Sequence, residues 1–93
     1  MNNSEQKKDD APGQNKEFII IVNAKEKNWL EKNINFQQLV ILAFGNFEDN
    51  QSTAYTVTYK RGEEKKSEGS MVIGDAVHVK DKMIFNVSKT NKS

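Results

Sequence analysis

The sequence predicts an α+β fold of two layers, in which one amphipathic helix lies across one face of a mixed sheet of four or five strands. Three observations lead to this prediction. A β-branched run, F-I-I-I-V, fills residues 18–22, and a single helical pattern covers residues 36–44. Alternating apolar and polar residues then recur over residues 53–61 and again toward Val87.

Size and composition limit the classes of function. The 93 residues make one small domain, and 14 basic against 13 acidic residues give a net charge of +1. So balanced a charge does not favour nucleic acid or an anionic membrane as a partner. The chain contains no cysteine, which excludes disulfides, thiolate metal sites and a cysteine nucleophile. No run approaches the roughly 18 apolar residues of a membrane span, and no apolar signal segment is expected at the start.

Three segments are expected along the chain. Residues 1–16 contain almost nothing to bury and include the only proline, so we expect a disordered N-terminal arm. The folded domain is predicted over residues 17–88, and residues 89–93 are expected to form a flexible polar tail. The first strand, within residues 17–23, is apolar on both faces and should lie centrally in the sheet. A polar turn at residues 24–27 is expected to lead into an antiparallel return strand at residues 28–32, with Trp29 at the rim or in the core of this hairpin.

The helix has recognisable start and stop residues. Asn35 suits the N-cap, and Gln38 can reach back to complete a capping box. Ile34 and Leu39 are placed as a hydrophobic staple, and Gly45 supplies the left-handed residue that ends the helix. The apolar face predicted to meet the sheet contains Phe36, Leu39, Val40 and Ala43.

Two turns organise the last part of the chain. A charged loop at residues 61–69 precedes the turn Gly74-Asp75, after which Val77 and Val79 alternate with polar residues. A second reversal is expected at residues 81–82. The final strand should then direct Met83, Phe85 and Val87 into the core.

The motif G-D-x-V-x-V-x-D-x-M-x-F-x-V, at residues 74–87, resembles the C-terminal part of the bacterial multiubiquitin family. Three upstream motifs fit the same family in the same order, so the resemblance covers residues 17–93. They are Val22-Asn23, Leu39-x-x-Leu42-Ala43-Phe44-Gly45 and Tyr55-x-Val57-x-Tyr59-x-x-Gly62. The resemblance implies a ubiquitin-like β-grasp fold, whose first and last strands lie side by side in parallel. The sequence departs from the pattern at Lys82, where a turn glycine is expected, and it lacks a Gly-Gly ending.

The resemblance implies a cytoplasmic, ubiquitin-like protein modifier. Its partners would be an E1-like activating enzyme, an E2-like enzyme, a processing peptidase and a target protein joined to its C-terminal carboxylate. The conjugation tail would consist of Lys89, Thr90, Asn91, Lys92 and Ser93. Without Gly-Gly, either a bulkier terminus is accepted, or a peptidase first trims the tail, or several such units are strung together. Asn23, Asp75 and Lys82 are expected to be dispensable for tail chemistry.

Other classes of function remain open. The alternative is a non-conjugated β-grasp module for protein–protein interaction; a sulfur carrier of similar fold would need the absent Gly-Gly. The only histidine, His78, lies on the polar phase of its strand without metal-ligand partners at usable spacing. We therefore expect no catalytic, cofactor or metal site.

One surface is predicted from strand phase. If Phe18, Ile20 and Val22 point at the helix, the intervening residues must point away from it. A partner-binding patch of Ile19, Ile21 and Ile84 is then expected on the outer face of the sheet. The competing interpretation is that these isoleucines only buttress the central strands, or lie partly beneath the loop at residues 61–69.

Overall fold

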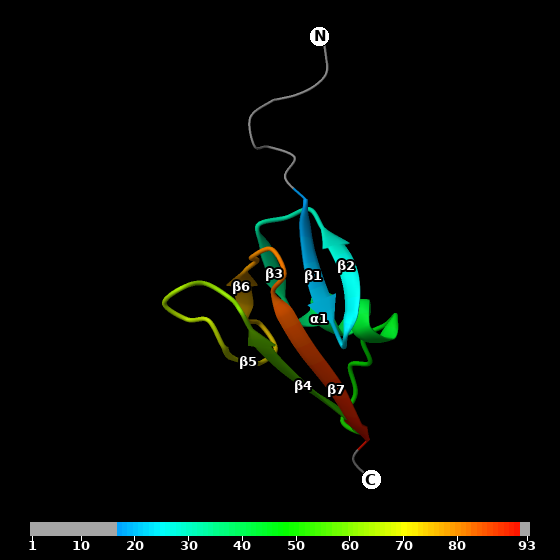
Figure 1. Cartoon of the computed structure of the whole chain (residues 1–93). Coiled ribbons are helices and arrows are strands. Elements are labelled where there is room, and N and C mark those ends of the chain that lie inside the picture. The colour runs from blue at the N-terminus through cyan, green and yellow to red at the C-terminus, as the bar shows by residue number, and fades with distance from the viewer. Residues whose placement is uncertain (1–16, 92–93) are drawn as a thin grey trace.

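The computed structural model describes residues 17–91, in which a five-stranded mixed sheet carries one helix on one face (Figure 1). The elements in chain order are β1 (Phe18–Val22), β2 (Lys25–Trp29), β3 (Asn33–Asn35), α1 (Phe36–Phe44), β4 (Thr53–Lys60), β5 (Gly69–Met71), β6 (Ala76–His78) and β7 (Ile84–Asn91). The main sheet has the order β2-β1-β7-β4-β5, and β1 and β7 are parallel at its centre. This arrangement confirms the predicted ubiquitin-like β-grasp fold. The arm predicted at residues 1–16 lies outside the described residues.

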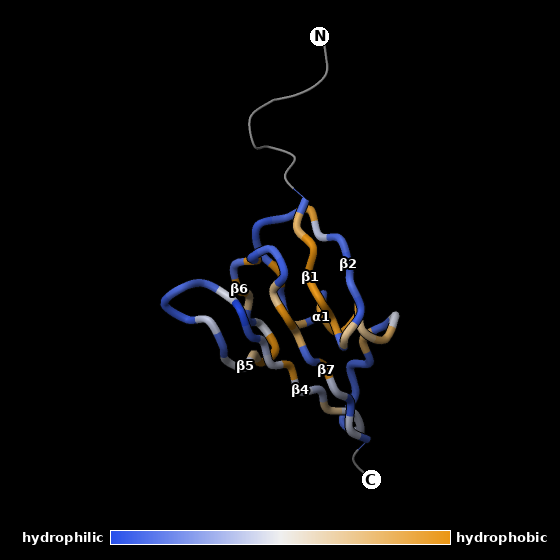
Figure 2. Tube along the Cα trace, viewed as in Figure 1, coloured by the Kyte–Doolittle hydropathy of each residue, from blue (hydrophilic) through white to orange (hydrophobic). Residues whose placement is uncertain are grey.

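The core lies between the sheet and α1. Ile20 and Val22 of β1 and Phe85 and Val87 of β7 are buried on the helix side, as strand alternation predicts. Figure 2 shows β1 as a continuous apolar strand beside the hydrophilic β2. The remaining buried side chains are Ile34, Phe36, Leu39, Val40, Val57, Tyr59, Met71, Val79 and Met83. Within residues 17–91, no helix is long and apolar enough to cross a membrane.

Both ends of α1 form as predicted. The Asn35 side chain accepts a hydrogen bond from the Gln38 N–H (2.7 Å), and the Gln38 side chain accepts one from the Asn35 N–H (2.9 Å). These two bonds satisfy donors that the first helical turn leaves free. At the other end Gly45 has φ 88°, and its N–H donates to the Ile41 carbonyl at 2.7 Å. Glycine takes this left-handed conformation without a steric penalty.

The first hairpin corrects one predicted boundary. The turn consists of Asn23 and Ala24, with φ of 52° and 70°, and the return strand begins at Lys25 rather than at residue 28. A tight turn between twisted strands requires left-handed residues, and asparagine tolerates that conformation. The polarity of residues 25–28 reflects the place of β2 at the sheet edge, where charged side chains prevent association with other strands.

A second, two-stranded sheet was not predicted. Residues 33–35 pair with residues 76–78 before α1 begins, which places Ile34 in the core with no exposed surface. The turn after β6 behaves as the family pattern implies. Lys82 has φ 69°, the left-handed conformation that glycine would adopt most easily at this position.

Candidate functional site: the carboxyl-terminal half of β7

The last strand continues well beyond its parallel neighbour. β1 is in register with β7 only at Ile84 and Phe85, whereas β4 pairs with β7 along its whole length to Asn91. The predicted tail boundary is therefore wrong for three residues: Lys89, Thr90 and Asn91 lie in β7, opposite Tyr55, Ala54 and Thr53. The cause is that backbone pairing needs no apolar side chains on the added residues. Lys92 and Ser93 lie outside the described residues.

The side chain of Asn23 marks the point where β7 leaves β1. Its Nδ2 donates to the Val87 carbonyl (2.9 Å), and its Oδ1 accepts from the Val87 N–H (2.8 Å). The Asn23 N–H also donates to the Phe85 carbonyl at 3.0 Å. A primary amide carries a donor and an acceptor in one plane, so it can pair with a strand as a backbone would. Asn23 thereby carries the hydrogen bonding along this edge of β7 from Phe85 to Val87.

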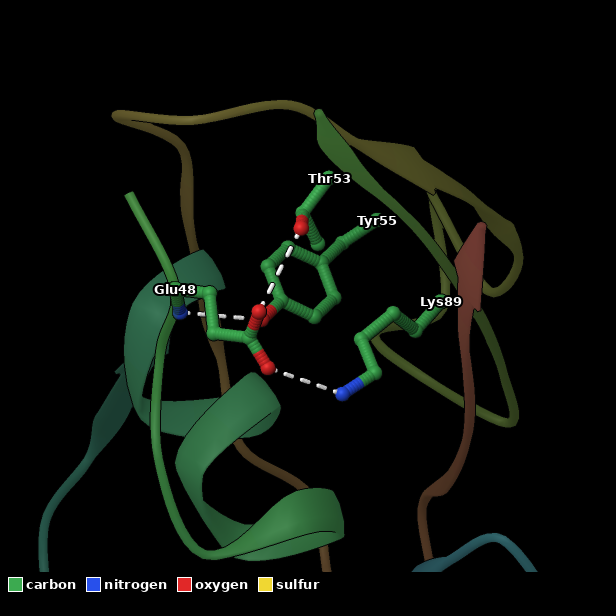
Figure 3. A network of polar contacts seen from close by, with 4 residues as sticks. All are labelled: Glu48, Thr53, Tyr55 and Lys89. Carbon is green, nitrogen blue, oxygen red and sulfur yellow. Dashed lines mark hydrogen bonds and ion pairs between the residues drawn. The ribbon is translucent and has the colours of Figure 1, made fainter. Parts of the chain in front are cut away.

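A polar network on the helix side of the sheet holds Lys89, two positions after Val87 in β7 (Figure 3). Lys89 Nζ lies 3.0 Å from Glu48 Oε2 and 5.4 Å from the centre of the Phe44 ring. The Thr53 hydroxyl donates to Glu48 Oε1 at 3.3 Å, and the Glu48 N–H donates to the Tyr55 hydroxyl oxygen at 2.9 Å. These contacts join the segment after α1 to both β4 and β7.

The network shifts the pKa values of Glu48 and Lys89. The hydrogen bond from Lys89, reinforced by its charge, lowers the pKa of Glu48 below the ordinary value of 4.5. The same bond and the charge of Glu48 raise the pKa of Lys89 above 10.5. Each group therefore favours the charged form of the other. The ion pair therefore helps to orient the end of β7.

Comparison with known families agrees with this geometry. The family model for multiubiquitin matches residues 18–91. The chain belongs to the multiubiquitin family. The matched segment begins at the first residue of β1 and ends at the last residue of β7, so the strand residues 89–91 are part of the family domain. Neither the curated proteins nor the solved structures that were searched include a match.

The ion pair of this multiubiquitin domain should make its stability depend on pH. Because the pKa of Glu48 is lower in the folded state, its contribution is present above about pH 4.5 and is lost as the pH falls through the folded-state value. The contribution of Lys89, whose pKa is raised, is present below about pH 10.5 and is lost at higher pH.

We expect the melting temperature of Glu48→Gln to lie below that of the parent at neutral pH and to converge with it in acid. Lys89→Gln should give the same convergence, because it removes the same ion pair. Thermal melts followed by circular dichroism between neutral and acidic pH measure both variants. A Glu48→Gln deficit that stays constant down to strong acid would contradict this assignment.

The three isoleucines of the predicted patch share one face of the sheet. Ile21 and Ile84 are in register across β1 and β7, and Ile19 lies two residues away on the same face of β1. All three are half-buried. The loop at residues 61–69 reaches instead toward β6, where Glu63 Oε2 lies 3.3 Å from His78 Nδ1. The structure thus brings the three side chains together on the face away from α1.

Some residues of this region were missed by sequence reasoning. Asn23 had one usable signal, because asparagine before a tight turn often forms side-chain bonds to the backbone. Glu48 had none, since its partner Lys89 lies 41 positions away in sequence. In the part of the chain that the structure describes, no three histidine or acidic side chains gather as a metal site.

Proposed function

We propose that this domain is a bacterial, cytoplasmic ubiquitin-like protein modifier. In this proposal E1-like and E2-like enzymes recognise its body, and a carboxylate in the segment that follows β7 is joined to a target protein. The domain is then a substrate of the pathway and not an enzyme. One observation carries the proposal: β7 takes the chain past the end of β1 to the tip of the molecule, where residues 88–91 are all exposed (Figure 1).

A modifier needs a rigid body for recognition and a slim reactive end, and these two parts lie in different places in this domain. The rigid body comes from the sheet, the capped helix and the Asn23 bonds to Val87. The reactive end must be slim enough to enter an active site, and a strand at the tip of the sheet delivers it there. Carboxylate activation uses ATP, and the thiol of any thioester must come from a partner because this chain has no cysteine.

The extent of β7 also limits processing. Residues 89–91 pair with β4, and Lys89 is held by Glu48. A peptidase that trims the tail must therefore cut beyond Asn91 to leave this strand intact. In this proposal the residues that react in a partner's active site follow Asn91, unless the partner first opens the last three pairs of the β4–β7 ladder.

A truncation tests the proposal. The chain ending at Asn91 keeps the whole of β7, so its melting temperature should match that of the full chain. Incubated with ATP and its E1-like and E2-like partner enzymes, the full chain should form covalent adducts and the truncated chain none. Intact-mass spectrometry detects the adducts. Adducts formed by the truncated chain would reject a reactive carboxylate beyond Asn91, and the absence of adducts from the full chain would reject conjugation.

The second candidate is a non-conjugated interaction module. The cluster of Ile19, Ile21 and Ile84 favours it, because contiguous apolar surface away from a core marks a binding face. Under this alternative the truncation after Asn91 leaves partner binding unchanged. The substitutions Ile21→Asp and Ile84→Asp then abolish binding. Under the modifier proposal the same face serves enzyme recognition, so both substitutions reduce adduct formation.

A further inference from the structure

A groove opens on the helix side of the sheet, between the segment that follows α1 and the turn that follows β5. Its volume is about 420 Å³, within the range of roughly 300–1,000 Å³ that is usual for binding pockets. Its apolar lining comes from three places in the chain: the start of α1, the segment after it, and β4 with β5. These side chains are Phe36, Phe47, Tyr55 and Met71.

The turn of residues 72–75 forms one wall and displays two large aliphatic side chains. Val72 is 64% exposed and Ile73 is 65% exposed. The turn is nevertheless closed twice, because the Asp75 N–H donates to the Val72 carbonyl (2.9 Å) and the Asp75 carboxylate accepts from the Val72 N–H (3.0 Å). The Phe36 N–H further ties it to α1 by donating to the Asp75 carbonyl at 3.1 Å. An apolar rim held this rigidly loses little entropy when a partner binds.

The segment of residues 47–50 forms the opposite wall, and its rim is acidic. The Phe47 ring stacks on Tyr55 with centres 5.3 Å apart, and the Glu48 N–H donates to the Tyr55 hydroxyl oxygen. Asp49 is exposed and forms no ion pair within residues 17–91. No lysine or arginine belongs to the described residues that line the groove, whereas Glu48 and Asp49 both do. Glu48 is paired with Lys89, so the unpaired negative charge of this lining, within residues 17–91, is that of Asp49.

We propose that this groove docks an extended segment of a partner protein, in which an aliphatic or aromatic side chain is followed by lysine or arginine. The apolar side chain would lie on Phe36 and Met71 against the exposed Ile73. The cation would lie at Asp49, whose charge no residue of the described chain neutralises. The acidic rim selects this occupant over an anionic one, because a like charge at the rim is repelled. The groove shares Glu48, Thr53 and Tyr55 with the network that holds Lys89, and it lies on the opposite face of the sheet from the isoleucine patch.

A peptide titration followed by nuclear magnetic resonance tests the chemistry of the occupant. The probe is a blocked peptide, GSLFKRSG, added to the isotope-labelled full chain without ATP or any enzyme. Saturable shifts should cluster on the amides of residues 47–50, 53–55 and 71–73. The control peptides GSSSKRSG and GSLFEESG should each bind about tenfold more weakly or worse, because each lacks one of the two required features. The proposal is overturned if no saturable shifts appear, if they cluster on the isoleucine patch, or if a control peptide binds equally well.

Two protein variants locate the site. Ile73→Ser should raise the dissociation constant of GSLFKRSG about tenfold, since it removes exposed apolar surface at the rim. Leu30→Ser is the matched control: Leu30 is 67% exposed but lies outside the groove, so its dissociation constant should not change. Asp49→Asn should weaken binding and reduce its salt dependence. Equal effects of Ile73→Ser and Leu30→Ser would refute the site, whatever the outcome of the adduct experiment.

Discussion

Replacing Leu39 by alanine is expected to lower the free energy of unfolding by about 3–5 kcal/mol, the usual cost of a large cavity in a packed core. Leu39 lies on the sheet-facing side of α1 and has no exposed surface. Its position in the sequence also makes it the predicted staple partner of Ile34. A small domain commonly has only about 5–15 kcal/mol of total stability, so this variant should be close to unfolding. Urea denaturation followed by circular dichroism measures the change.

Leu30→Ala is the control for this prediction. It makes the same chemical change at a residue that is 67% exposed, so its effect should stay within about 0.5 kcal/mol. The difference between the two variants isolates burial from residue type. If both variants lose similar stability, or if Leu39→Ala loses less than about 1 kcal/mol, α1 does not pack on the sheet as described.

Replacing Asn23 by alanine should lower the free energy of unfolding by about 2 kcal/mol, even though the residue lies in an exposed turn. The variant leaves the N–H and carbonyl of Val87, a buried residue, without their partner. It also places alanine at φ 52°, a conformation that costs about 1 kcal/mol or more for residues with a Cβ atom. The loss should be accompanied by faster hydrogen exchange of the Val87 amide.

Asn23→Gly separates the two causes. Glycine adopts the left-handed conformation freely, so this variant should lose the two side-chain bonds to Val87 but not the conformational energy. Its stability should therefore lie between that of the parent and that of Asn23→Ala. Unchanged exchange of the Val87 amide in both variants would show that the side chain of Asn23 does not hold β7. Whether Asn23 is dispensable for tail chemistry is a separate question. Adduct formation by the Asn23→Gly variant answers it.

Local signals were sufficient where the governing interaction spans a few residues. The capping box of Asn35 and Gln38, and the left-handed Gly45, each depend on partners within one helical turn. Strand phase was equally local, which is why the inward residues of β1 and β7 and the outward Ile19, Ile21 and Ile84 could be assigned. The predicted start of the return strand in the first hairpin was wrong because an edge strand and a turn are both polar. Composition alone does not distinguish them.

The end of β7 was decided by contacts between distant segments. Nothing in the sequence S-K-T-N favours a strand over a flexible tail, yet β4 offers a ladder that pairs with residues 88–91. The Glu48–Lys89 pair and the groove between residues 47–50 and 72–75 arise in the same way, from segments that only the folded sheet brings together.

The sequence by itself determined the fold class, the helix with both of its ends, the family and the two faces of the central strands. These features follow from periodicity and capping, whose interactions lie close together along the chain. The tertiary structure alone decided how far β7 extends, which side chains hold it and where the groove between residues 47–50 and 72–75 lies. Each of these features depends on which strand edges and charged side chains come into contact in the folded sheet. The local pattern of apolar and polar residues does not specify these long-range contacts.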